Sequence, residues 1–434
     1  MDKKALPHRV KFDTLGCKLN FSESATIAQQ LQERGIATTV EAGEVPDICV
    51  VNTCSVTALA DRKCRQHIRS LVRNYPHALI VVTGCYAQLQ GKSIAEIEGV
   101  DIVLGNEQKG DVVDYIEQWL KDHSKTLAVT AHKEMRRFSP SCECGDRTRY
   151  FLKVQDGCDY YCSYCTIPLA RGRSRSGSIE SLVAQAREVA ERGGKEIVIT
   201  GVNIGDFGKD TGEQVLDLLN ALDHVEGIER YRISSIEPDL LGDDVIDWCA
   251  TSRAFMPHFH IPLQSGNDEV LSLMRRHYRR DLFARKVERI RQVIPHCFIG
   301  VDVMVGTRGE TPERFDDSLQ FIASLDVQHL HVFPYSERPG TMALRIPYIV
   351  PKAERTQRVA RMMELSERQQ REFVNRHLGT ERPVLWEQPA AGSKVMHGFT
   401  DNYIRVTVPY REDMVNKVTT VLLDPSIVST THNS

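Results

Sequence analysis

Short apolar runs alternate with longer amphipathic stretches along the first part of the chain. The predicted strands lie at 10–14, 47–52, 79–83 and 101–104, and the predicted helices between them at 22–34 and 58–74. Alternating strands and helices are typical of a parallel sheet with helices on its faces. We therefore expect residues 8–125 to form a small, open, parallel α/β domain.

A second alternating series follows a polar, charged stretch at 126–145, which we interpret as a linker. Its predicted strands lie at 150–154, 196–200, 231–234, 258–262, 298–305 and 328–334, and its predicted helices include 179–192, 282–293, 312–325 and a long polar one at 352–377. Six consecutive strand–helix units joined by right-handed crossovers are typical of a barrel or partial barrel. This pattern predicts a partial (β/α)6 barrel over residues 146–377.

The last part of the chain, residues 378–434, changes to short β segments separated by turn residues. These segments lie at 382–388, 394–399, 403–408 and 417–423. Small all-β modules of this size are often five-stranded barrels of the oligonucleotide-binding kind. The chain is thus predicted as an α/β protein of three folded parts, with a small β-barrel at its end.

Composition and charge narrow the function classes. The 434 residues carry 55 Lys and Arg against 58 Asp and Glu, a net charge of −3, which excludes a generally basic nucleic-acid coat. No apolar run approaches the ~18 residues of a membrane span, and no apolar segment follows the first basic residues as in a secretory signal. We therefore expect a cytoplasmic protein, in which grouped cysteines among the 12 present bind metal or take part in redox chemistry.

Three cysteines far apart in the sequence share one structural position. Cys17, Cys54 and Cys85, called here the auxiliary cysteines, each follow a predicted parallel strand and stand just before a helix. The loops at the carboxyl ends of such strands converge on a ligand-binding crevice. Three thiolates there would hold an iron–sulfur cluster or a zinc ion with one open position, whereas three isolated cysteines would be small buried apolar residues. Four others lack comparable partners and are interpreted as core residues: Cys49, Cys64, Cys249 and Cys297.

A second group of cysteines has a specific spacing. Cys158, Cys162 and Cys165, called here the loop cysteines, form C-x3-C-x2-C directly after the first predicted barrel strand. A structural zinc site usually takes four protein ligands, and no fourth cysteine follows nearby. Three closely spaced thiolates suit a 4Fe-4S cluster whose fourth iron is free to bind a small molecule. Tyr164 beside that open position would offer a ring for stacking on a base.

The C-x3-C-x2-C loop and the six strand–helix units resemble the radical S-adenosylmethionine superfamily. The resemblance implies that S-adenosylmethionine chelates the open iron and is cleaved by one electron to a 5′-deoxyadenosyl radical. Ligands of this fold lie at the carboxyl ends of the strands, although each polar residue there could also be an ordinary one. The candidate cofactor-binding residues are Tyr164, Gly201, Asn203, Ser235, Glu237, Gln264 and Gly306. Gly193 and Gly194 look like a Gly-Gly-Glu cofactor motif but precede the second strand, so we interpret them as a helix-ending turn.

Longer segments narrow the resemblance to the methylthiotransferases. Residues 165–176, 260–266 and 333–341 are similar to that family, as is the order of a three-cysteine domain, a barrel and a terminal β module called TRAM. Residues 200–205 are most similar to the branch that acts on threonylcarbamoyladenosine in tRNA. The loop Gly-Thr-Arg-Gly-Glu at 306–310 departs from the Gly-Phe-Pro-Gly-Glu of the family, which puts its local shape in question.

The resemblance implies a mechanism with two 4Fe-4S clusters, one on the auxiliary and one on the loop cysteines. The auxiliary cluster would hold or relay the sulfur, and one S-adenosylmethionine would methylate it. A second would yield the radical that removes hydrogen from C2 of the adenine. The implied partners are a tRNA anticodon stem-loop and an electron donor such as flavodoxin. The alternatives are isopentenyladenosine in tRNA or a ribosomal protein residue as substrate, and, in another class, a non-catalytic RNA-binding protein with structural zinc sites.

Contacts with RNA need local positive charge. Arg171, Arg173 and Arg175 adjoin the cysteine loop and are expected to bind phosphates near the target base. A second basic run at 275–291 is typical of a solvated helix face. Phe399 and Tyr403 of the terminal module would stack on bases or pack in its core. For Cys142 and Cys144 in the linker, donation of a ligand, thiol exchange and no role at all stay open.

Overall fold

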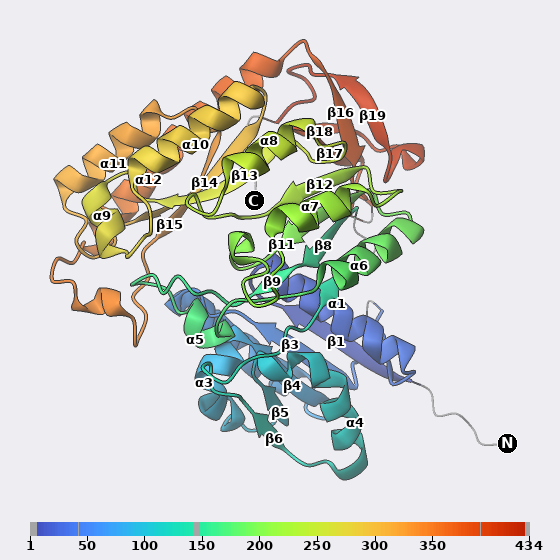
Figure 1. Ribbon diagram of the computed structural model, residues 1–434. Coiled ribbons are helices and arrows are strands. Elements are labelled where there is room, and N and C mark those ends of the chain that lie inside the picture. Colours follow the sequence, from blue (N-terminus) through green and yellow to red (C-terminus); the bar gives the residue numbers. More distant parts are fainter. Residues whose placement is uncertain (1–6, 42, 143–147, 391, 430–434) are drawn as a thin grey trace.

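The computed structural model describes residues 7–41, 43–142, 148–390 and 392–429 (Figure 1). An N-terminal α/β domain lies on one side of a central barrel, and a C-terminal sheet lies at the opposite end of that barrel. None of the helices in the described ranges is both long enough and apolar enough to cross a membrane.

The N-terminal domain is the open α/β domain that the alternating pattern predicts. Its six strands are all parallel in the order β2-β1-β3-β4-β5-β6. They are β1 (His8–Thr14), β2 (Ala37–Thr39), β3 (Ile48–Thr53), β4 (Leu79–Gly84), β5 (Ile102–Leu104) and β6 (Thr126–Ala128). The helices are α1 (Lys18–Glu33), α2 (Ala58–Asn74), α3 (Cys85–Ala95), the 3-10 turn η1 (Glu107–Asp111) and α4 (Val112–Asp122). Strand β6 pairs with β5 inside the stretch interpreted as a linker, so the sheet continues past residue 125.

Two apolar layers hold this sheet between its helices. Helices α1 and α4 cover one face, and α2 and α3 cover the other. Strands β3 and β4 are buried along their whole length, as expected for inner parallel strands that are covered on both faces. The first helix begins at Lys18, four residues before the predicted start, because the alternation of Leu19 and Phe21 with polar neighbours does not follow a helical period.

The central part is the predicted partial barrel with one additional edge strand. Its strands are β7 (Ser141–Cys142), β8 (Arg149–Lys153), β11 (Glu196–Thr200), β12 (Arg230–Ile233), β13 (His258–Gln264), β14 (Phe298–Val305) and β15 (His329–Pro334). They form two sheets, β12-β11-β8-β7 and β13-β14-β15, which a bridge between Tyr231 and Phe255 connects. The six predicted strands run parallel, and β7 pairs antiparallel with β8.

Helices and short 3-10 turns connect the strands of this barrel. They are α5 (Ile167–Arg171), α6 (Ile179–Glu191), η2 (Ile204–Asp206), α7 (Val215–Asp223), α8 (Asp243–Thr251), α9 (Asp268–Leu273), α10 (Arg280–Val293), α11 (Pro312–Ser324), η3 (Met342–Arg345) and α12 (Lys352–His377). A small antiparallel pair, β9 (Gln155–Asp156) and β10 (Arg175–Ser176), flanks the cysteine loop. Gly193 has a φ of +81° just after α6, so the glycine pair is the helix-ending turn that we expected.

The C-terminal module packs on the amino ends of the barrel strands. Among the described residues it is a four-stranded antiparallel sheet in the order β18-β17-β16-β19, and an isolated antiparallel bridge pairs Val428 with Val406 of β18. Its elements are β16 (Glu381–Trp386), β17 (Val395–Thr400), β18 (Arg405–Pro409), η4 (Glu412–Met414) and β19 (Val418–Leu422). Arg230 and Arg232 of β12 donate hydrogen bonds of 2.9 to 3.0 Å to backbone carbonyls of this module.

The two aromatic residues proposed for base stacking face the barrel instead. Tyr403 packs against His258 and Phe298, at ring-centroid distances of 4.4 and 5.7 Å. Phe399 stacks on Tyr403 and lies under the guanidinium of Arg149. Core packing is therefore the role that the structure gives to both rings.

A buried set of charged side chains joins the N-terminal domain to the barrel. Glu23 of α1 accepts hydrogen bonds from Lys109 of η1 at 2.5 Å, from Lys153 of β8 at 3.0 Å and from Arg171 of α5 at 2.9 Å. Asp156 of β9 lies within 3.0 Å of both Lys153 and Arg171. We call these residues, together with Arg175 at 3.7 Å from Asp156, the Glu23–Asp156 network. Each of its six side chains is at most 6% exposed.

The network predicts how the protein responds to loss of one carboxylate. Glu23→Gln leaves three buried cations short of a partner, so we expect the free energy of unfolding to fall by about 3–5 kcal/mol in urea titrations. The control Asp114→Asn removes the exposed ion pair with Arg34 and should cost less than about 1 kcal/mol. Equal losses in the two variants would contradict the importance of the buried network.

The Glu23 carboxylate also makes the stability of the protein depend on pH. Burial alone would raise the pKa of Glu23, but Arg171, Lys109 and Lys153 outweigh it and hold that pKa below its ordinary value. A lowered folded-state pKa stabilises the protein at neutral pH, and this contribution is lost as the pH falls below the ordinary range of glutamate. The difference in stability between the native chain and Glu23→Gln should therefore shrink on acidification.

Candidate active site

The three auxiliary cysteines lie at the carboxyl ends of neighbouring parallel strands. Cys17 precedes α1 after β1, Cys54 follows β3, and Cys85 follows β4 as the first residue of α3. These strands are adjacent in the order β1-β3-β4. Gly16 has a φ of +116°, and a Cβ there would lie only 2.7 Å from the Cβ of Cys54, so glycine permits the loops to approach.

The surroundings of these cysteines suit a metal cluster. Cys54 and Cys85 are buried and Cys17 is exposed. Burial, together with the neighbouring Cys85 and Cys17, raises the pKa of the Cys54 thiol to about 12. Such a thiol stays protonated at neutral pH unless a cationic centre binds it. Asn106 donates its side-chain N–H toward the Cys85 Sγ at 3.7 Å, a contact that stabilises a thiolate.

The loop cysteines lie between β9 and α5, and each sulfur has an N–H group beside it. The backbone N–H of Tyr160 donates to Cys158 at 3.5 Å, and that of Ile167 to Cys165 at 3.4 Å. The Arg276 guanidinium donates to the Cys162 sulfur at 3.2 Å. Hydrogen bonds to sulfur are one of the means by which proteins set the potential of an iron–sulfur cluster.

No three His, Cys, Asp or Glu side chains within the described ranges are arranged to hold a single metal ion. N–H groups approach four of the six sulfurs, those of Cys85 and of all three loop cysteines. The donor set of three thiols with N–H groups therefore fits a 4Fe-4S cluster. The assignment of the six cysteines as cluster ligands stays a prediction.

Arg276 is a site residue that the sequence analysis missed. It lies in the basic run interpreted as a solvated helix face, yet its side chain is buried between the rings of Tyr160 and Tyr278. It forms an ion pair with Glu237, which follows β12. Burial raises the pKa of Glu237 to about 7 against the opposing effect of Arg276. Tyr164 lies 3.5 Å from Arg276 through its hydroxyl, so this predicted residue also belongs to the site.

Asn203, after β11, has a buried side-chain amide whose two polar atoms are available to bind a ligand. It is 2% exposed, and neither its side-chain oxygen nor its side-chain nitrogen has a hydrogen-bond partner in the described part of the chain. A buried amide normally finds partners because an unpaired one costs about 1–3 kcal/mol. Gly201 permits Gln155 to approach, since a Cβ there would lie 3.1 Å from the Gln155 Oε1 that binds the backbone N–H of Asn203.

The remaining predicted cofactor residues have different surroundings. Ser235 is partly exposed just after β12, and Gln264 has a φ of +66° where the register of β13 shifts. Gly306 has a φ of +74° and lies against Arg355, with its N–H donating to Glu310. The positive φ, together with the 2.3 Å that would separate a Cβ here from the Arg355 Cγ, explains this glycine without a cofactor.

The unusual loop at 306–310 is anchored to a neighbouring segment. Arg308 pairs with Glu337 at 2.9 Å and donates to the carbonyl of Leu344 at 2.6 Å, while Thr307 is buried. Arg308 thus has structural partners of its own, whereas the buried hydroxyl of Thr307 has no hydrogen-bond partner among the described residues.

Two of the three arginines predicted to bind RNA are not available to it. The side chains of Arg171 and Arg175 are 1% and 6% exposed and belong to the Glu23–Asp156 network. That prediction is wrong for these two because carboxylates from distant parts of the chain bury them. Arg173 is 68% exposed and pairs only loosely with Asp159, at 3.3 Å.

Cys142 is buried in β7, where its backbone bonds to Thr26, and Cys144 lies outside the described residues.

The inner face of the second barrel sheet is polar, which the sequence analysis also missed. His260 of β13 binds Asp302 of β14 at 2.9 Å and stacks on His331 of β15 at a centroid distance of 4.9 Å. Alternate residues of β14 face outward into the apolar core. Burial lowers the pKa of His331 to about 3, so this ring is neutral at pH 7.

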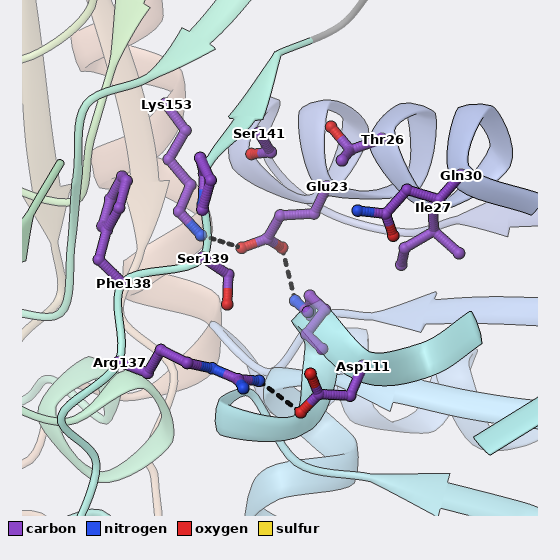
Figure 2. A pocket seen from close by; sticks show the side chains of 13 residues that line it. Glu23, Thr26, Ile27, Gln30, Asp111, Arg137, Phe138, Ser139, Ser141 and Lys153 are labelled. Atoms are coloured by element: carbon purple, nitrogen blue, oxygen red, sulfur yellow. Dashed lines mark hydrogen bonds and ion pairs between the residues drawn. The ribbon is translucent and has the colours of Figure 1, made fainter. Parts of the chain in front are cut away.

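A cavity of about 220 Å³ lies between α1, η1 and residues 137–141 (Figure 2). Glu23, Lys109 and Lys153 form its inner wall, and Arg137 and Asp111 pair at its rim. The cavity therefore borders the charged network and contains none of the six proposed cluster ligands.

Comparison with known proteins agrees with this organisation. The model of uncharacterized protein family UPF0004 matches residues 9–105, and that of the radical SAM superfamily matches residues 152–322. A solved radical S-adenosylmethionine methyltransferase, TsrM from Kitasatospora setae with cobalamin and a [4Fe-4S] cluster bound, aligns with a TM-score of 0.59. The alignment covers 78% of each chain at 16% sequence identity, so the similarity concerns the fold alone.

Curated relatives extend over nearly the whole chain. The threonylcarbamoyladenosine tRNA methylthiotransferase MtaB of Bacillus subtilis is 37% identical over 95% of this chain and 93% of its own length. The protein of that name from Aquifex aeolicus is 34% identical over 96% of this chain and 100% of its own length. The tRNA-2-methylthio-N(6)-dimethylallyladenosine synthase of Syntrophotalea carbinolica is 31% identical over 95% and 96%. The chain therefore belongs to the methylthiotransferase family of radical S-adenosylmethionine enzymes.

Proposed function

We propose that the protein adds a methylthio group to C2 of threonylcarbamoyladenosine next to the anticodon of tRNA. The observation that supports the proposal is that the helix after the cysteine loop, α5, packs against α3, which begins at the auxiliary Cys85, across the domain boundary. Asn106 links them, because its side-chain N–H lies 3.7 Å from the Cys85 sulfur and 2.8 Å from the carbonyl of Ala170, in the helix that follows the cysteine loop. Relatives named for this substrate at 32–37% identity support the choice of branch.

Two 4Fe-4S clusters and S-adenosylmethionine are the cofactors that this function requires. The loop cysteines would hold a cluster that could supply an electron for cleavage of S-adenosylmethionine, and the auxiliary cysteines would hold one that could carry the sulfur to be transferred. An electron donor such as flavodoxin would reduce them, and the tRNA substrate places the protein in the cytoplasm.

The residues of the chain prepare the site for these groups. Arg276 holds the Cys162 sulfur and orients Glu237, while the unpaired amide of Asn203 binds polar groups of S-adenosylmethionine. Arg173, exposed beside the cysteine loop, contributes a phosphate contact to the anticodon stem-loop. We place Ser235 and Gln264 around the same cofactor, since both lie at carboxyl ends of barrel strands.

Nucleoside analysis tests the substrate directly. In tRNA from a strain that lacks the gene, mass spectrometry should show threonylcarbamoyladenosine accumulating and its methylthio derivative absent. Methylthiolated isopentenyladenosine should persist at its normal level in the same digest. Loss of the isopentenyl derivative instead would assign the protein to the other substrate branch.

Cysteine variants separate the roles of the two sites. Cys158→Ala should abolish 5′-deoxyadenosine formation, because the cleaving cluster loses a ligand, whereas Cys54→Ala should retain some cleavage that is uncoupled from product. Anaerobically prepared native protein should hold about eight iron per chain, as two 4Fe-4S clusters require. Equal loss of cleavage in both variants would contradict this division, and zinc without iron would favour the non-catalytic alternative.

The unpaired amide predicts a binding defect. Asn203→Ala should weaken S-adenosylmethionine binding to the reconstituted protein by roughly 10- to 100-fold, as loss of a buried hydrogen-bonding group implies, with iron content unchanged. Equilibrium dialysis measures the dissociation constant. Asn220→Ala on α7, whose side chain is exposed, serves as the matched control, and equal binding by both variants would remove Asn203 from the cofactor site.

A further inference from the structure

Two asparagines, Asn20 and Asn106, link the end of helix α5 to all three loops that carry the auxiliary cysteines. The Arg171 guanidinium donates to the Asn20 Oδ1 at 2.8 Å. Asn20 in turn donates to the carbonyls of Leu15, at 2.7 Å, and Thr53, at 3.1 Å, which lie in the loops of Cys17 and Cys54. The carbonyl of Ala170 accepts the Asn106 N–H that also approaches the Cys85 sulfur. Two consecutive residues of the barrel domain therefore connect to three separate loops of the N-terminal domain.

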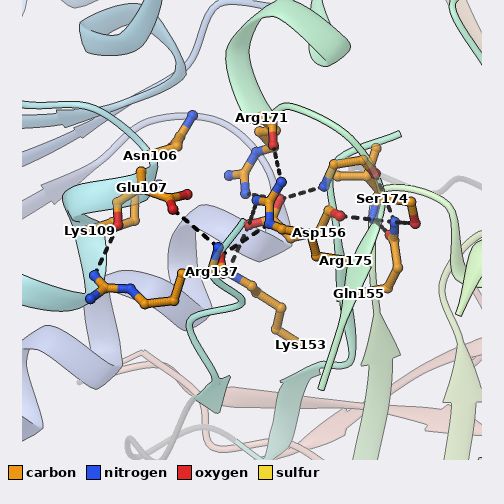
Figure 3. Close-up of polar contacts among 12 residues, drawn as sticks. Asn106, Glu107, Lys109, Arg137, Lys153, Gln155, Asp156, Arg171, Ser174 and Arg175 are labelled. Carbon is orange, nitrogen blue, oxygen red and sulfur yellow. Dashed lines mark hydrogen bonds and ion pairs between the residues drawn. The ribbon is translucent and has the colours of Figure 1, made fainter. Parts of the chain in front are cut away.

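The same region carries an excess of buried positive charge. In the Glu23–Asp156 network, four cations face two carboxylates, and every one of these side chains is nearly inaccessible to solvent. Figure 3 labels Lys109, Lys153, Asp156, Arg171 and Arg175 of this network. Uncompensated buried charge is costly, so an anionic group is expected beside it. The auxiliary cysteines, whose loops Asn20 and Asn106 connect to the end of α5, are the neighbouring source of negative charge when a cluster binds them.

We propose that Arg171 is a positioning residue for the auxiliary cluster, and that its buried positive charge favours the reduced state of that cluster. The inference rests on the proposed function, which places a 4Fe-4S cluster on Cys17, Cys54 and Cys85. One electron from the reductase adds one negative charge to the cluster and breaks no bond, so a fixed cation nearby stabilises the product of reduction. Glu23 and Asp156 hold the guanidinium in place from opposite domains.

Arg171 also relates the two cluster sites to one another. It lies six residues after Cys165, at the end of the short helix that begins at Ile167. Helix α5 packs against α3, whose first residue is Cys85. The short helix α5 thus connects Cys165 to Arg171, whose hydrogen bonds support the loops of the auxiliary cysteines.

The test uses the full-length chain with the three loop cysteines replaced by alanine, so that only the auxiliary cluster assembles. Redox titration followed by electron paramagnetic resonance, without RNA or S-adenosylmethionine, gives its midpoint potential. Arg171→Met removes the buried charge, and we expect the equilibrium constant for one-electron reduction to fall about tenfold, a shift of about 59 mV to more negative potential. Arg171→Lys keeps the charge and should shift the potential much less.

Arg173→Met is the matched control, because Arg173 lies two residues away with an exposed side chain. An unchanged potential in Arg171→Met, or an equal shift in Arg173→Met, would overturn the proposal. If Arg171→Met does not fold, Lys109→Met removes a charge of the same network from the N-terminal side. A negative shift there supports the proposal, and no shift overturns it.

Iron content distinguishes this outcome from failure of the proposed function. The background protein without loop cysteines should retain about four iron per chain. A chain that holds no iron would refute the auxiliary cysteines as cluster ligands, and with them this inference. A chain that holds about four iron and shows the same potential with and without Arg171 would refute the inference alone.

Discussion

The ionic contact between Glu23 of α1 and Arg171 of α5 is the constraint on which the site depends. Each domain has an apolar core of its own, so each could fold without the other's cysteines. The distance between the two cysteine groups, however, is set only where the domains meet. A buried charge pair suits this purpose because, unlike apolar packing, it tolerates neither sliding nor separation of its partners. The geometry of the candidate active site is therefore a property of the interface.

The sequence predicted the order of elements well because strand and helix periods are local. The six barrel strands, the parallel N-terminal sheet and the position of each cysteine at a strand end all follow from patterns a few residues long. Asn203 could be found in the same way, since the barrel fold places ligands at the ends of its strands. The start of α1 and the short strand β6 were missed because neither carries an apolar period.

The errors arose where burial depends on residues far away in the chain. Arg171 and Arg175 were interpreted as exposed because clustered charges usually are, yet Glu23 lies 148 residues before Arg171 and buries it. The burial of Arg276 could not be predicted from its basic run for the same reason, because its partner Glu237 lies at the end of a different strand. The polar layer of His260, Asp302 and His331 could not be predicted because it forms only when three strands lie side by side in register.

The attachment of the C-terminal module has an evolutionary consequence. All four hydrogen bonds that Arg230 and Arg232 donate to it end on backbone carbonyls, those of Pro383, Phe399, Thr400 and Asp401. A carbonyl group is the same whichever side chain stands at its position, so substitutions in the module leave these bonds in place. Selection can therefore change side chains on the outer face of the module while these hydrogen bonds still attach it to the barrel.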